Sequence, residues 1–272
     1  MGRFTLYAFT AAVVGIGLQA GSARATLVAY DPFAYSPGAG ALANQNGGSG
    51  WTGTWGPGTN NVVSPGLTYS KNSVALATSG NSSETAGGNI GNFRALPGTI
   101  STGTAYVSLL AKLDGGTAGN SYAGVSLFNG GSENLFIGQP SGSTVWGLDQ
   151  ATGPQLTSVP EDGTVHLFVV QIDYGAGAGG NDRVRMYVDP TPGLAAPDVA
   201  AAIDVSTTRS AAFNQIRIQS GANQVAFDEV RVASDYASTT VPEPASLAVV
   251  AMGAVGLLAR RGRRGISRRP AC

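Results

Sequence analysis

The sequence predicts an all-β protein folded as an antiparallel β-sandwich, and two observations carry this prediction. Short segments rich in β-branched and aromatic residues alternate with clusters of Gly, Asn, Ser and Pro, as strands alternate with turns. Long helical periodicity is missing, and Pro197 interrupts the alanine-rich stretch 194–202, which has room for a turn or two of helix at most. Many short strands separated by turn signals are typical of two packed sheets.

Eight segments are expected to form the main strands. Arg183 and Arg185 alternate with Val184 and Met186, so that strand should have one face on water, and 215–219 has the same alternation. The stretch 165–172 is apolar on both faces and belongs in the middle of a sheet. In chain order the segments are 105–113, 124–128, 134–138, 144–148, 165–174, 183–188, 215–219 and 225–232.

The first 25 residues have the pattern of a secretory signal peptide. Arg3 precedes an apolar stretch, and Ala23 and Ala25 supply the small residues that signal peptidase accepts before its cut. We therefore expect export, with Thr26 as the first residue of the mature chain.

The last 32 residues, 241–272, have three parts in a fixed order. The motif Val241, Pro242, Glu243 and Pro244 comes first, and the apolar run 245–259 follows. That run is fifteen residues long, shorter than the roughly 20 that span a bilayer comfortably, so we expect a short transmembrane helix. Arginines remain on the cytoplasmic side of a membrane, and here they follow at once: Arg260, Arg261, Arg263 and Arg264. Residues 233–240, rich in Ser and Thr, are expected to be a spacer.

This tail resembles the PEP-CTERM sorting signal of Gram-negative bacteria that make extracellular polysaccharide. The resemblance implies a membrane enzyme, exosortase, as a processing partner, and transient insertion into the inner membrane before delivery to the cell surface or extracellular matrix. The alternative is a plain single-pass anchor in which Pro-Glu-Pro is accidental.

Charge limits the classes of partner that the exported segment 26–240 can bind, and cysteine content limits how this segment is stabilised. Residues 26–240 hold eight basic and fifteen acidic residues, so this segment is acidic although the whole chain is neutral. An acidic domain is a poor partner for nucleic acid or anionic lipid. The one cysteine, Cys272, ends the tail, so the mature domain needs a core rather than disulfides for its stability.

Five short motifs occur between and within the expected strands: residues 29–33, 46–55, 135–138, 182–190 and 227–232. Together they resemble a concanavalin A-like, laminin-G-like domain. The resemblance implies a jelly-roll sandwich over residues 26–232, whose closing strand lies beside the N-terminal one.

We assign no catalytic residue and expect no enzyme. His166 is the single histidine and lies in an apolar strand, which favours a packing role. Glycosidases of this fold carry Glu-x-Asp on one strand, so that both carboxylates face the cleft, whereas Asp228 and Glu229 are adjacent and should point to opposite faces. Glu161 and Asp162 are adjacent too. A divergent glycan hydrolase is thus the least favoured function.

Two binding hypotheses remain beside a structural or adhesive role in the polysaccharide layer. Trp51, Trp55 and Trp146 have indole faces suited to stacking on sugars, as in a lectin-like module, although tryptophans also plug the ends of sandwiches. Calcium is the one cofactor considered, in the loops 114–116 and 181–182, where ordinary hairpin turns are the simpler interpretation. No other metal site is expected.

Overall fold

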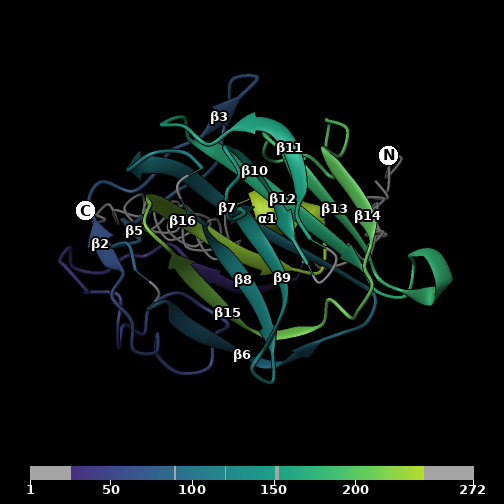
Figure 1. Ribbon diagram of the computed structural model, residues 1–272, viewed down its shortest axis with the longest axis horizontal. Helices are drawn as coiled ribbons and strands as arrows, with labels where there is room; N and C mark the ends of the chain where they lie inside the picture. Colours follow the sequence, from purple (N-terminus) through teal and green to yellow (C-terminus); the bar gives the residue numbers. More distant parts are fainter. Residues whose placement is uncertain (1–25, 89, 120, 151–152, 242–272) are drawn as a thin grey trace, which may run out of the picture.

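The structure is a computed structural model that describes residues 26–88, 90–119, 121–150 and 153–241 (Figure 1). This part of the chain is almost entirely β-structure. The elements are β1 (Leu27–Asp31), β2 (Asn61–Val63), β3 (Ser70–Lys71), β4 (Val74–Ala75), β5 (Ser82–Glu84), β6 (Asn92–Ile100), β7 (Thr104–Gly115), β8 (Ala123–Asn129), β9 (Ser132–Gln139), β10 (Val145–Asp149), β11 (Gln155–Pro160), β12 (His166–Asp173), η1 (Ala178–Gly180), β13 (Arg183–Val188), β14 (Ile203–Ser206), β15 (Phe213–Ser220), β16 (Gln224–Ala233) and α1 (Tyr236–Thr240).

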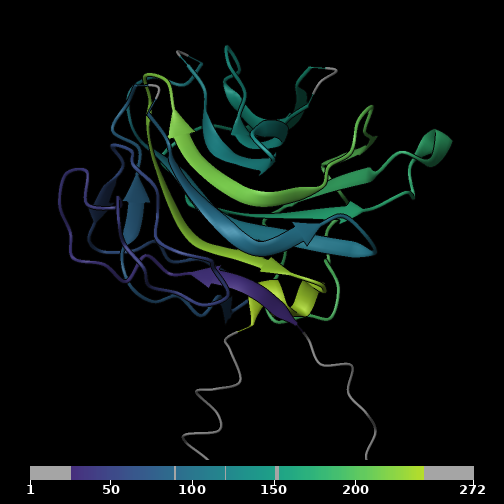
Figure 2. The same ribbon diagram turned by 90° about the horizontal axis from the view of Figure 1, so that it is seen from below.

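The strands form two packed antiparallel sheets, which confirms the predicted sandwich. The outer sheet has the order β14-β13-β12-β7-β16-β5-β2, with β1 also paired to β16. The inner sheet has the order β11-β10-β9-β8-β15-β6, and β3 and β4 form a separate hairpin. Figure 2 shows both sheets strongly curved, with the inner sheet on the hollow side of the curve and β1 and α1 on the opposite side.

All eight predicted strands are present, and their packing follows the sequence pattern. Strand β12 is apolar on both faces and lies between β7 and β13, so its central placement is confirmed. Its residues Phe168, Val170 and Ile172 enter the main core between the sheets. The pairing of β16 with β1 confirms the expected return of the closing strand beside the N-terminal one.

The face of the outer sheet that points away from the core is less exposed to solvent than the alternation in 183–188 predicts. Arg183 and Arg185 do reach outward, but Tyr187 is buried in a second apolar cluster with Leu110, Leu167 and Val169. The cover comes from α1 and the segment 64–81, which strand periodicity does not reveal.

The prediction that residues 233–240 form a spacer is wrong, because this segment is part of the folded domain. Ala233 ends β16, and residues 236–240 form α1, with Tyr236 and Thr239 at most 2% exposed. Asp235 caps the helix by accepting from the backbone N–H of Ser238 at 2.9 Å. The Tyr236 hydroxyl donates to the Thr191 carbonyl at 3.1 Å, so the domain extends to Thr240.

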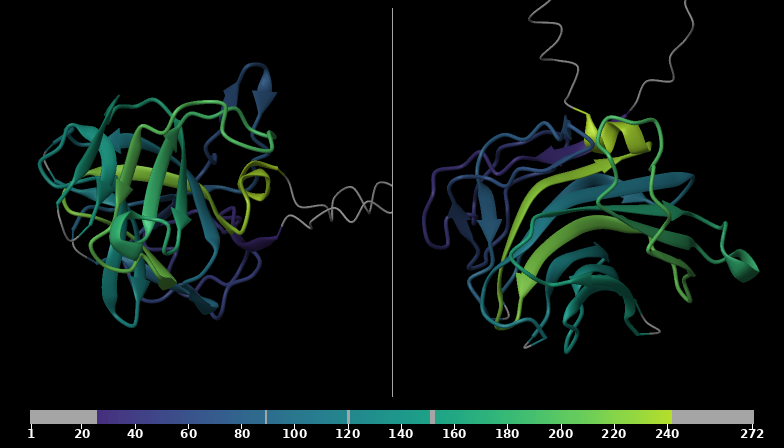
Figure 3. Two further views of the ribbon diagram at one scale, coloured as in Figure 1. Left: turned by 90° about the vertical axis from the view of Figure 1, so that its right-hand side faces the viewer. Right: turned by 90° about the horizontal axis from the view of Figure 1, so that it is seen from above.

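The two ends of the described chain lie side by side on the outer sheet (Figure 2 and Figure 3). Ser234 donates its backbone N–H to the Thr26 carbonyl at 3.1 Å, and the Thr26 N–H reaches the Asp235 carboxylate at 3.0 Å. The predicted leader, with Ala23 and Ala25, and the tail from Pro242 onward, with its apolar run and arginines, lie outside the described residues. Within the described ranges, no helix is long and apolar enough to cross a membrane.

Candidate functional site

The predicted sugar-stacking tryptophans are mostly part of the core. Trp55 and Trp146 are both 0% exposed, so neither indole offers a face to a ligand, and the lectin hypothesis is wrong for these two residues. Trp146 packs on Phe168 between the sheets, with ring centroids 5.2 Å apart. Trp51 is partly exposed, and its indole N–H donates to the Tyr30 carbonyl at 3.0 Å.

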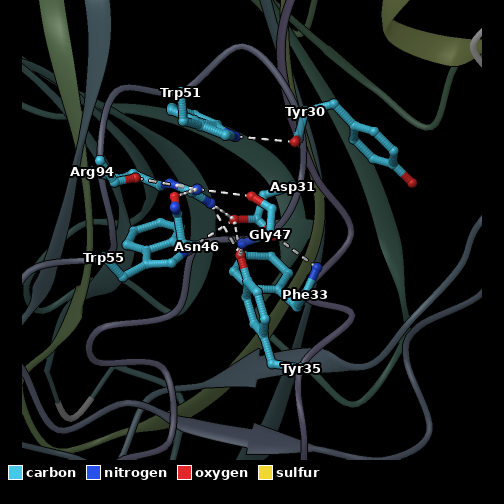
Figure 4. A network of polar contacts seen from close by, with 10 residues as sticks. Tyr30, Asp31, Phe33, Tyr35, Asn46, Gly47, Trp51, Trp55 and Arg94 are labelled. Atoms are coloured by element: carbon cyan, nitrogen blue, oxygen red, sulfur yellow. Dashed lines mark hydrogen bonds and ion pairs between the residues drawn. The ribbon is translucent and has the colours of Figure 1, made fainter.

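A buried ion pair explains why two tryptophans occur in the glycine-rich loop 46–55 (Figure 4). The Asp31 carboxylate binds Arg94 and also accepts from Trp55 Nε1 at 2.8 Å and from the Tyr35 hydroxyl at 2.8 Å. The Arg94 guanidinium lies 5.4 Å from the Trp51 ring and 5.7 Å from the Trp55 ring. The aromatic rings thus exclude water from a charge pair.

The glycines of this loop allow it to lie directly on the backbone of β1. A Cβ on Gly50 would come within 1.9 Å of the Val28 carbonyl, and one on Gly48 within 2.2 Å of the Tyr30 carbonyl. Both glycines have positive φ angles, which favour glycine. The loop is therefore a structural clamp over the ion pair.

The adjacent carboxylates on β16 are buried and do not face opposite ways, which corrects the sequence-based expectation. Glu229 has a φ of 54° within a bulge, so both side chains turn to the segment 64–81. Asp228 accepts from the Leu67 N–H at 2.7 Å and Glu229 from the Ser79 N–H at 2.8 Å. Burial, with the neighbouring Glu229 carboxylate, raises the pKa of Asp228 to about 9.

Two other titratable groups singled out by the sequence are buried as well. The Glu161 side chain is 3% exposed and meets the Asn223 amide, and burial raises its pKa to about 7. His166 Nδ1 lies 2.8 Å from the Asp189 carboxylate, in agreement with a packing role. Neither group opens onto a pocket described below.

The proposed calcium loops have their carboxylates engaged by the protein. Asp114 pairs with Lys112 at 2.6 Å, and Asp182 accepts from the backbone N–H groups of Gly175 and Ala211. In the described ranges, three or more His, Cys, Asp or Glu side chains gather nowhere in a metal-binding arrangement.

The candidate site is instead a groove on the exposed face of the inner sheet. Three neighbouring pockets of about 410, 290 and 280 Å³ lie on it. The first includes Phe93 and Phe128, the second Phe136 and Arg217, and the second and third share Glu133 and Asp149. We call this surface the inner-sheet groove.

Strand register places the groove residues in one row across five strands. Arg217 on β15 is opposite Phe93 on β6 and Ser126 on β8. Ser126 is opposite Phe136 on β9, which is opposite Asp149 on β10. Since side chains alternate along a strand, their neighbours Ile216, Ile218 and Val125 enter the core while this row faces outward.

Arg217 is the centre of the row. Its guanidinium lies 4.6 Å from the Phe128 ring and 5.5 Å from the Phe93 ring, and these two rings meet edge to face at 5.3 Å. The same guanidinium donates to the Glu133 carboxylate at 2.9 Å. Stacking and the ion pair hold the donor group in a fixed position at the floor of the groove.

A second aromatic pair borders the groove on the side of β9. Tyr122 meets Phe136 edge to face at 6.3 Å, and the Gln219 amide donates to the Tyr122 hydroxyl at 2.8 Å. A Cβ on Gly124 would lie 2.5 Å from the Phe136 ring, so this glycine permits the ring to approach the strand closely.

Comparison with known proteins identifies the tail. Residues 240–264 match the model of the PEP-CTERM protein-sorting motif. The chain carries a PEP-CTERM sorting motif. The motif indicates an exported protein that is processed by an exosortase-type system and sorted to the cell surface. It begins at Thr240, the last residue of α1, so the sorting signal follows the folded domain without a spacer.

Comparisons of the whole chain yield only distant similarities. No curated protein matches. Among solved structures, the endo-β-1,4-glucuronan lyase from the fungus Trichoderma reesei has 13% identity and a TM-score of 0.48, covering 79% of this chain and 98% of that one. The cellulose induced protein Cip1 has 16% identity and a TM-score of 0.42, with 75% and 93% covered. A type G botulinum neurotoxin receptor binding domain has 10% identity and a TM-score of 0.40, with 70% and 46% covered.

The inner-sheet groove was missed in the sequence because no local motif marks it. Its row combines residues from five strands, and only strand pairing brings them together. The one sequence signal is the alternation of Gln215, Arg217 and Gln219 with isoleucines, which predicts a face but not what lies opposite it.

Proposed function

We propose that this exported protein binds extracellular polysaccharide through the inner-sheet groove and has an adhesive role at the cell surface. The observation that carries the proposal is Arg217, held between the Phe93–Phe128 pair and Glu133 on a grooved, open sheet face. Sugar rings have apolar C–H faces and hydroxyl edges, and they suit a floor that combines aromatic rings with fixed donors and acceptors.

The position of the chain ends supports this proposal. Thr26 bonds to Ser234 directly after β16, and Val241 follows α1, which lies on the outer sheet, while the pockets of the groove lie on the inner sheet. While the apolar run 245–259 is inserted in the inner membrane of a Gram-negative cell, the groove would therefore face away from the lipid. Removal of the leader by signal peptidase after Ala25, and retention of the arginines Arg260 to Arg264 in the cytoplasm, belong to the same proposal.

Polysaccharide binding is tested with purified residues 26–241 on a glycan array and in affinity gels containing the host's extracellular polysaccharide. We expect retardation in the gel that Phe93→Ala reduces at least about fivefold, because the partly exposed ring is one wall of the groove. Leu194→Ala is the matched control, since Leu194 is 39% exposed beside α1 and should bind like the wild type. Equal retardation of all three proteins and of an inert reference protein would refute the proposal.

Processing is tested by intact mass measurement of the protein recovered from the cell surface. We expect a chain that begins at Thr26 and lacks the arginine cluster, and a precursor retained in the membrane when Pro242 and Pro244 are replaced by alanine. Recovery of Cys272 on the surface protein would contradict sorting by cleavage.

A divergent glycan hydrolase remains the competing function, because Glu133 and Asp149 share a pocket. Release of reducing ends from bound polysaccharide, lost in Glu133→Gln, would replace the binding proposal with an enzymatic one. We expect no release.

A further inference from the structure

We propose that the ligand of the inner-sheet groove is an uncharged glycan chain that lies across the strands from β6 to β10. This inference rests on the proposed function and adds the chemical class and direction of the ligand.

The direction follows from how the three pockets adjoin. The first pocket is lined from β6, β15 and β8, the second from β15, β9 and β10, and the third from β9 and β10. Strand β8 lies between β15 and β9, so the second pocket extends across it. Four steps between neighbouring strands separate β6 from β10, which makes the groove about 19 Å long. A groove of that length fits several consecutive sugar units better than a terminal monosaccharide.

The charge of the groove argues against an anionic chain. Arg217 is already neutralised by Glu133. Arg209, at the far end, shares its pocket with both Glu133 and Asp149. The basic and acidic side chains of the groove therefore balance, and the domain around them is acidic over residues 26–240. A polyanion would be repelled at long range and would find no cation without a carboxylate nearby.

The hydrogen-bonding groups of the groove favour a ligand that donates hydrogen bonds. The carboxylates of Glu133 and Asp149 line the groove and can only accept hydrogen bonds. Hydroxyl groups supply donors for these carboxylates and acceptors for Arg217, whereas an ionised carboxylate or a sulfate group supplies only acceptors.

The test is calorimetric titration of residues 26–241 with neutral gluco-oligosaccharides of increasing length and with uronic acid oligosaccharides of matched length. For the neutral series we expect affinity to rise at least tenfold from the disaccharide to the hexasaccharide. We expect a change of less than twofold between about 0.05 and 0.5 M NaCl, because a neutral ligand is not screened. The uronic acid series should bind at least tenfold more weakly.

Two variants connect the result to the groove. Arg217→Gln should weaken binding of the neutral hexasaccharide about tenfold. Because Arg217 also packs against two rings, Tyr122→Phe serves as the milder variant: it keeps the aromatic ring, removes one hydroxyl at the rim and should weaken binding about threefold. Asp204→Asn, on the outer sheet, is the control and should bind unchanged.

The outcomes separate this inference from the proposed function. Tighter, salt-sensitive binding of the uronic acid series would overturn the uncharged ligand while leaving polysaccharide binding in place. Full affinity for a monosaccharide would overturn the extended chain. Binding to neither series, together with a negative glycan array, would overturn both proposals.

Discussion

Arg94 and Asp31 are the clearest case of a residue pair on which the fold depends. Both side chains are at most 1% exposed. The Asp31 carboxylate accepts hydrogen bonds from four groups: Arg94, Tyr35, Trp55 and the Phe33 backbone N–H. Removal of one member of a buried pair leaves the other charge without compensation. The glycine-rich loop 46–55 is folded around this pair.

We therefore predict that Asp31→Asn lowers the free energy of unfolding by about 3–5 kcal/mol. The surface pair Arg183–Asp204 is the matched comparison, since both of its side chains are more than 40% exposed. Asp204→Asn should change stability by less than about 1 kcal/mol. Urea titration followed by tryptophan fluorescence measures both, and similar small losses in the two variants would show that the pair is not structural.

The raised pKa of Glu161 predicts a stability that falls as pH rises. Its folded pKa of about 7 exceeds its ordinary value of 4.5, so the folded state binds a proton more tightly than the unfolded chain. The stabilising contribution is complete below pH 4.5 and is lost as pH rises through 7. Replacement by the isosteric Glu161→Gln should remove this part of the pH dependence, on the order of 3 kcal/mol between pH 4.5 and 7. Parallel curves of unfolding free energy against pH for the two proteins would contradict the assignment.

Among the elements, the short helix α1 has the largest effect on domain boundaries. Five residues are too few for an isolated helix, so α1 depends on its cap and on contacts with the outer sheet. Ser108 donates to the Thr239 carbonyl at 2.9 Å, and Asp235 binds both Ser238 and the Thr26 N–H. The start and the end of the domain are thus stabilised by one side chain.

We predict that Asp235→Ala destabilises the domain by about 1 kcal/mol, the usual value of an N-cap. Asp235→Asn keeps a capping oxygen and should lose less than half as much. Thermal unfolding of residues 26–241 distinguishes them, and an equal loss in both variants would show that charge rather than capping is decisive.

Elements with strong periodicity were predictable from the sequence, and those defined by tertiary context were not. Strands such as β13 and β15 alternate cleanly and were found. Strand β6 contains Pro97 and Gly98, a pattern that predicts a loop. The proline is tolerated because β6 is an edge strand, where its missing N–H removes no hydrogen bond between strands. The sequence of α1 predicts a spacer because its Ser and Thr residues favour turns, and only burial against the outer sheet makes it a helix.

At the scale of the whole domain, the two sheets have different roles. The outer sheet carries both chain ends, α1 and the buried charges of β1 and β16. The inner sheet leaves its hollow face open, with Arg217 and four aromatic rings on it. The sorting motif indicates delivery to the cell surface, and α1, which ends the described domain, lies on the sheet opposite the groove.

The most direct test of the central claim is a map of backbone amide chemical shifts of residues 26–241 during titration with a neutral gluco-oligosaccharide. We predict saturable shifts confined to the row Phe93, Arg217, Ser126, Phe136 and Asp149 and its neighbours, and constant signals for α1 and β1. Shifts that gather around Trp51 or the outer sheet, or the absence of saturable shifts in the row, would contradict the assignment of the inner-sheet groove as the binding site.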